Sequence, residues 1–177
     1  MTKTNDLTEG KVSRVLLGFF FPMLFTNLLQ QIYTFADSAI VGKGLGDNSL
    51  AAVGNMSALT LLIIGFAQGI TNGFSVIIAQ NFGSKDMSAL RKSIAISIKL
   101  SLILSVILTA ISLIFLKSVL IAMKTDEIII EESLIYGYII FGGLTATMAY
   151  NLCSCILRAL GDSKTPFIAI IISSALN

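Results

Sequence analysis

Long runs of apolar residues, separated by short polar joints, dominate this chain. Such runs are typical of transmembrane helices, because about 20 apolar residues are needed to cross a bilayer as an α-helix. We predict helices over five segments of this kind: 15–41, 50–82, 93–116, 128–157 and 166–177. The last would reach only about 18 Å at 1.5 Å per residue, short of a hydrocarbon core of about 30 Å. The pattern therefore predicts an all-α polytopic membrane helix bundle, with four complete spans and a truncated fifth.

The composition excludes a water-soluble globular protein and several classes of function. Apolar residues make up 55% of the 177 and charged residues 12%, with a mean hydropathy of +0.88, whereas soluble domains carry about 25% charged residues. A net charge of +2 offers no basic face for nucleic acid. The chain has no histidine, which excludes Ser-His-Asp triads, and its two cysteines alone cannot make a zinc site. We therefore expect no metal, no cofactor and no nucleic-acid partner.

Lysine and arginine residues in the joints predict which ends of the helices face the cytoplasm. If residues 1–14 form a cytoplasmic segment ahead of a transmembrane region over 15–177, the inner joints carry eight basic residues: Lys3, Lys11, Arg14, Lys85, Arg91, Lys92, Arg158 and Lys164. The outer joints then carry three: Lys43, Lys117 and Lys124. Because cytoplasmic loops are enriched in these residues, we expect a cytoplasmic N-terminus. We also expect a multi-pass protein of a bacterial plasma membrane.

The first predicted span is unusually polar for a helix surrounded by lipid. Its polar residues recur at intervals of three and four, which gathers them within about 120° on one face. They are Asn27, Gln30, Gln31, Thr34, Asp37 and Ser38, with Tyr33 at the edge of the face. One interpretation is that the amides of Asn27 and Gln31 only hydrogen-bond to a neighbouring helix. The other is that this face lines a polar cavity.

Asp37 is the only acid in the apolar stretch 34–41. An aspartate at the bilayer centre costs about 2.5–3.5 kcal/mol on insertion scales, and Asp37 lies in the outer part of its span, where the cost is lower. It is therefore either an ordinary carboxylate at the outer water interface or a site that binds a proton or a cation. No second intramembrane acid accompanies it and the chain has no histidine, so we do not expect an enzyme.

Small and polar residues in the later spans suggest close helix packing. Gly65, Gly69 and Gly73 form a small-residue ridge at intervals of four, and serines at 93, 97, 101 and 105 follow the same spacing. We interpret both as packing seams. In the fourth span, Tyr136 and Asn151 are candidates to line a cavity, and Gly142 and Gly143 are candidates for packing or flexibility.

Several stretches together resemble the multidrug and toxic compound extrusion (MATE) family of antiporters. They are Pro22, Asn27, Leu28, Gln30, Tyr33, Asp37 and 41–42; 45–46 and 50–54; Gly69, Gly73, Ser75, 79–80 and Gly83; and 156–166, which is similar to the loop between that family's fourth and fifth helices. The resemblance covers about 7–177. It implies a transporter of two six-helix lobes around a central cavity, driven by H⁺ or Na⁺, with an organic cation as the usual cargo.

The resemblance also implies roles for individual residues. Asp37 matches an acid in the ion site of the N-terminal lobe. Gln30 and Tyr33 match cavity residues of the same helix, and Tyr136 matches a fourth-helix tyrosine near the ion site. Asn177 matches a fifth-helix asparagine that is normally followed one turn later by another acid, and the sequence stops before that position.

The resemblance leads us to expect an incomplete N-terminal lobe that lacks its C-terminal partner lobe. Alternating access needs two lobes, so we expect the chain alone not to transport. Two alternatives remain open. One is a flippase for lipid-linked precursors, whose anionic cargo should require basic residues facing the cavity. The other is a small membrane protein without transport activity that assembles with partners.

Overall fold

The structure, a computed structural model, describes residues 12–44 and 46–176. Helices are the only regular elements in these residues, which confirms the prediction of an all-α membrane helix bundle. The helices are α1 (Val12–Gly44), α2 (Asp47–Gly83), α3 (Met87–Ala122), α4 (Ile130–Gly142), α5 (Leu144–Ala159) and α6 (Lys164–Leu176). α1, α2 and α3 extend beyond the predicted apolar segments at both ends; in α3, for example, charged residues such as Arg91 and Lys117 continue the helix past the apolar core.

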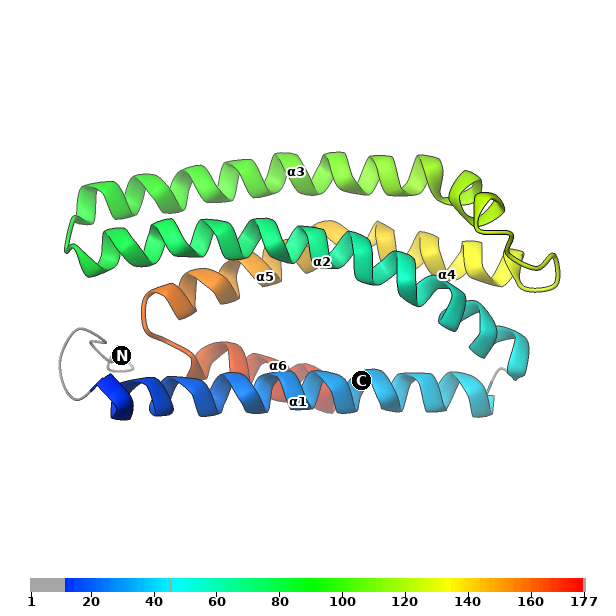
Figure 1. Ribbon diagram of the computed structural model, residues 1–177, viewed down its shortest axis with the longest axis horizontal. Helices are drawn as coiled ribbons and strands as arrows, with labels where there is room; N and C mark the ends of the chain where they lie inside the picture. The colour runs from blue at the N-terminus through cyan, green and yellow to red at the C-terminus, as the bar shows by residue number, and fades with distance from the viewer. Residues whose placement is uncertain (1–11, 45, 177) are drawn as a thin grey trace.

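The helices run back and forth along one axis (Figure 1). α2, α3, α4 and α5 pack together, and α1 and α6 lie against each other along one side of them. The α2–α3 turn and the α5–α6 turn lie at the same end of the bundle, where α1 begins. The α1–α2 joint and the segment between α3 and α4 lie at the other end. We call these the first end and the second end.

The fourth predicted span is broken. We expected one helix over 128–157, but α4 and α5 are separate helices that meet at a bend of 43°. The bend falls at Gly142 and Gly143, and paired small residues are a common site of helix kinks. By length and composition, α1, α2 and α3 are each able to cross a membrane among the described residues, and the bent pair can form a fourth span.

The tightest apolar packing lies where α2, α3 and α4 meet. Met56, Leu116, Leu120 and Phe141 form a buried cluster there. Gly137 of α4 is buried beside it, and a Cβ atom at this position would lie 2.7 Å from Leu116 Cδ2 and 2.8 Å from Met56 Cε. The absence of a side chain at Gly137 therefore allows α4 to approach the other two helices.

The two predicted packing seams have different outcomes. The serine seam of α3 is confirmed, because Ser97, Ser101 and Ser105 are buried. The glycine ridge has no packing partner among the described residues, where a Cβ atom built at Gly65, Gly69 or Gly73 meets no atom within 4 Å, so its packing role stays a prediction. Spacing alone could not distinguish them, because it shows that residues share a face and not which neighbour covers that face.

The start of α6 is held by Asp162 in the turn after α5. The Asp162 carboxylate accepts hydrogen bonds from the backbone N–H groups of Lys164 and Thr165, each at 3.0 Å, and from the Thr165 hydroxyl. Partial burial of Asp162 raises its pKa. The hydrogen bonds from Thr165 and Lys164 and the charge of Lys164 outweigh that effect, so the pKa lies below its ordinary value.

Asp162→Ala should destabilise the chain by about 1 kcal/mol at neutral pH, because it removes the acceptor of the first N–H groups of α6. A carboxylate with a lowered pKa stabilises the fold above its unfolded pKa, and this contribution is lost as the pH falls through the folded pKa. The difference between variant and wild type should therefore shrink in acid. Thermal unfolding in detergent across a pH series would measure it, with exposed Glu127→Ala as the control. A difference that persists in strong acid would contradict the capping role.

Candidate functional site

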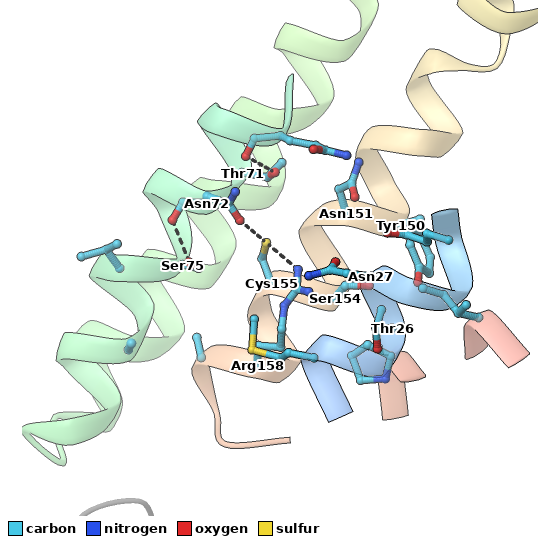
Figure 2. Close-up of a pocket in the computed structure, with 18 of the residues that line it drawn as sticks. Thr26, Asn27, Thr71, Asn72, Ser75, Tyr150, Asn151, Ser154, Cys155 and Arg158 are labelled. Carbon is cyan, nitrogen blue, oxygen red and sulfur yellow. Dashed lines mark hydrogen bonds between the residues drawn. The ribbon is translucent and has the colours of Figure 1, made fainter. Parts of the chain in front are cut away.

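A cavity of about 760 Å³ lies between α1, α2, α5 and α6. Three helices each contribute one face to its lining, through residues spaced i, i+3, i+4 and i+7. These are Met23, Thr26, Asn27 and Gln30 of α1; Gln68, Thr71, Asn72 and Ser75 of α2; and Asn151, Ser154, Cys155 and Arg158 of α5. Figure 2 shows the labelled members of these faces converging on one space. A volume of this size is within the range of small-molecule sites.

The lining is polar for a space between membrane helices. Amides and hydroxyls predominate, and Arg158 is the one charged residue among the described lining residues. A short hydrogen-bonded path joins α2 to α5: Cys155 Sγ donates to Asn72 Oδ1 at 3.2 Å, and Arg158 Nη2 donates to Cys155 Sγ at 3.4 Å (Figure 2). Polar groups in such a place suit a hydrated or ligand-filled cavity better than contact with lipid.

A second cavity of about 340 Å³ adjoins the first. It is lined by Gln30, Tyr33, Tyr150, Ala169, Ile170 and Ser173. Gln30, Tyr150 and Ile170 line both cavities, so the two form adjoining parts of one polar region along α1. The larger part reaches Arg158 near the first end of the bundle, and the smaller part reaches Tyr33, about one helical turn before Asp37.

The residues predicted for the substrate cavity fall into two groups. Gln30 and Asn151 line the larger cavity, and Gln30 and Tyr33 line the smaller one. Tyr136 lines neither; it is half-buried on α4 and packs against the cluster of Met56, Leu116, Leu120 and Phe141. The structure therefore brings three of the four candidates to the cavity region.

The residues predicted for the ion site lie beyond the cavities or outside the described residues. Asp37 is half-buried on α1 and lines neither cavity. Tyr136 lies on α4, within electrostatic range of the Asp37 charge on α1. Asn177 lies outside the described residues.

Sequence reasoning found Asn151 but missed the rest of the α5 face and the α2 face of the cavity. Arg158 was counted only as an inner basic residue, although its spacing from Asn151, Ser154 and Cys155 places all four on one helical face. On α2, the glycines at intervals of four were interpreted as a packing ridge. The polar face formed by Thr71, Asn72 and Ser75 lies in the same segment and was overlooked. A search for polar i, i+3, i+4, i+7 sets in every span would have found both.

Comparison with known proteins identifies the family. The MatE family model matches residues 22–177, which include all the described residues that line the cavities. The chain belongs to the MatE family. This MatE chain is therefore a multi-pass membrane protein, and the resemblance found in its sequence is confirmed.

Relatives of this MatE chain are longer than the sequence given. It is 33% identical to the probable multidrug resistance protein YoeA of Bacillus subtilis, over 98% of this chain and 38% of YoeA. It superposes on the crystal structure of MATE in the straight conformation with a TM-score of 0.89 and 31% identity, and on the bent conformation with 0.90 and 30%. Each alignment covers 99% of this chain and 39% of the solved one. The chain thus spans about two fifths of the length of these relatives.

Proposed function

We propose that this chain forms part of a cation-coupled antiporter, which exports small organic molecules in exchange for H⁺ or Na⁺. The observation that carries the proposal is the MatE match over residues 22–177, because the matched part contains the polar cavity. The name of YoeA as a probable multidrug resistance protein supports an organic cargo. The chain spans about two fifths of such relatives, so a second lobe completes the transporter.

The coupling ion binds at Asp37 in this proposal, with Asn177 as a further member of the site. Asp37 is half-buried in a membrane helix, so binding of H⁺ or Na⁺ offsets a charge that is costly there. Neutralisation of Asp37 removes a charge inside the bundle, and a local change of charge is the kind of event that biases one conformation over another.

Pro22 gives α1 a place to flex between the two ends of the bundle. It lies inside the helix, and proline cannot donate the backbone hydrogen bond to the carbonyl four residues earlier. Thr26 Oγ1 donates to the Pro22 carbonyl oxygen at 2.7 Å, and a hydroxyl that bonds to the carbonyl four residues earlier often bends a helix. Solved structures of related MATE proteins are described in a straight and a bent conformation, which supports more than one conformation for members of this family.

An organic cation is the cargo we propose for the smaller cavity. Two tyrosines, Tyr33 and Tyr150, line it together with the Gln30 amide, and aromatic faces attract organic cations. Arg158 lies two helical turns from Tyr150 along α5, about 12 Å at 1.5 Å per residue. A flippase for anionic precursors is less favoured, because amides and hydroxyls and not a set of basic residues form most of the lining.

The test is transport of a fluorescent organic cation into everted vesicles, whose lumen corresponds to the outside of the cell. One arm contains a chimaera in which this chain replaces the aligned residues of YoeA, and a second contains the isolated chain. We expect export by the chimaera only when an H⁺ or Na⁺ gradient is imposed, and none by the isolated chain. Transport by the isolated chain, or gradient-independent export by the chimaera, would reject this proposal.

The N-terminus faces the cytoplasm in this proposal, which follows from the excess of basic residues in the inner joints. A cysteine placed before residue 12 in a Cys153→Ser, Cys155→Ser background should resist a membrane-impermeant thiol reagent in intact cells and react once the membrane is permeabilised. Cysteine at position 127, between α3 and α4, is the opposite-side control and should react in intact cells. Labelling of the N-terminal cysteine in intact cells would contradict the orientation.

A further inference from the structure

Arg158 stands out in the larger cavity because no acid among the described residues balances its charge there. It is half-buried near the end of α5, which finishes at Ala159, and no acidic side chain occurs among the described lining residues. Asp162 is the nearest acid along the chain, four residues away. Its carboxylate is engaged by Lys164 and Thr165 in the cap of α6. Nothing in the described structure therefore serves as a counter-ion for Arg158.

The hydrogen-bonding capacity of Arg158 is also largely unused. A guanidinium group carries five N–H donors in a planar fork. In the described structure, Arg158 donates to the thiol sulfur of Cys155 at 3.4 Å, and sulfur is a weak acceptor. Cys155 is buried and in turn donates to Asn72 Oδ1, so this contact orients the arginine without neutralising it.

Neighbouring side chains add donors to the same space. Ser154 is buried one turn before Arg158 on α5, and Asn27 lines the cavity from α1. Neither side chain makes a hydrogen bond to another of the described residues. A hydroxyl and an amide beside a guanidinium are the groups that bind a phosphate or carboxylate, and the arginine fork matches two oxygens at once.

We propose that the end of the larger cavity around Arg158 is a binding site for an anionic group, a phosphate or a carboxylate. A charge held between membrane helices is costly unless it is paired, and a bound anion supplies the missing partner. The site lies near the first end of the bundle, which is the cytoplasmic end in the proposed orientation. The anion is carried either by the headgroup of an inner-leaflet lipid or by a soluble molecule that enters the cavity.

This inference deepens the proposed transport function by adding a second ligand chemistry to the same cavity region. Asp37, Tyr33 and Tyr150 bind cations on the side of the second end of the bundle. Arg158 binds anions on the side of the first end. Its test measures binding to the chain and not transport. An absence of phosphate binding would therefore reject the anion site and leave the transport proposal intact. An absence of export would reject the transport proposal and leave the anion site intact.

The experiment is isothermal titration calorimetry of the 177-residue chain in phosphatidylcholine nanodiscs, with inorganic phosphate as the probe. We expect Arg158→Gln to weaken phosphate binding about tenfold or more, because a charge-assisted bidentate contact contributes that much. Arg91→Gln is the matched control, since it removes an exposed arginine from the same end of the bundle, and it should change the affinity by less than about twofold. Equal affinities in wild type and Arg158→Gln, or an equal loss in Arg91→Gln, would overturn the proposal.

A second arm identifies the source of the anion, and a third needs no variant. If phosphatidylglycerol added to the nanodiscs competes with phosphate in wild type but not in Arg158→Gln, a lipid headgroup occupies the site. If it has no effect on phosphate binding, the ligand is soluble. In wild type, phosphate should also slow modification of Arg158 by phenylglyoxal and leave Arg91 unaffected. Equal protection of both arginines, or of neither, would contradict the site even if Arg158→Gln fails to fold.

Discussion

Asp37→Asn should abolish ion-coupled export by the chimaera of this chain with YoeA, while insertion and folding are retained. The substitution keeps the size of the side chain and removes its ability to bind a proton or pair with Na⁺. If ion binding at Asp37 drives the transporter between its two states, the variant has no coupling step and export falls to the level of empty membranes. Efflux of a fluorescent cation under an imposed gradient measures this, with protein amount determined in the same membranes.

Asp47→Asn is the matched control for this variant. Asp47 is an exposed acid in the first turn of α2, at the second end of the bundle, and it lines neither cavity. The same loss of charge there should leave export unchanged. Gradient-driven export that survives Asp37→Asn would reject the role of this carboxylate. Equal losses in both variants would indicate a general effect of surface charge.

Gly137→Leu should produce the largest loss of stability of any substitution considered in this chain. A leucine side chain at this buried position would extend from a Cβ that already lies 2.7 Å from Leu116 and 2.8 Å from Met56. Overpacking of this kind costs about 1–3 kcal/mol or more, and the backbone of α4 would have to move away from α2 and α3. Gly137→Ala should be milder, because the atoms in contact are the flexible ends of Leu116 and Met56.

Gly69→Leu provides the comparison within the same fold. A Cβ atom at Gly69 meets nothing within 4 Å, so a leucine there has room. Thermal unfolding of the purified chain in detergent should therefore show a clearly lower midpoint for Gly137→Leu than for Gly69→Leu. If Gly69→Leu is the more damaging of the two, the glycine ridge of α2 is a packing surface after all, and the packing of α4 described above is incorrect.

The fold could be predicted from the sequence to the level of helices, because long apolar runs between charged joints specify membrane spans directly. The break between α4 and α5 could not. Residues 128–157 are apolar enough throughout to continue as one helix, and two adjacent glycines permit a bend without requiring one. Tertiary packing determines whether this segment forms one helix or two, since α4 and α5 each pack against α2 and α3.

The candidate site was predictable where a polar face interrupts an apolar helix. Gln30 and Tyr33 were found because they lie on or beside the polar face of the first span and match cavity residues of the MATE family, and the cavities do reach both. Arg158 was missed because a basic residue near a helix end has an ordinary explanation in the positive-inside rule. Its spacing from Asn151, Ser154 and Cys155 places it on one polar helical face, and the three-dimensional arrangement shows that this face meets Asn72 of α2 at a cavity.

The most direct test of the central claim is the movement of the coupling ion itself. Proteoliposomes containing the chimaera would be loaded with an internal pH dye, or assayed with radioactive Na⁺ outside, and a gradient of the organic cation would be imposed. We predict that outward movement of the cargo drives H⁺ or Na⁺ inward, and that Asp37→Asn eliminates this flux. Cargo movement without any ion flux, or the same flux in Asp37→Asn, would contradict the account.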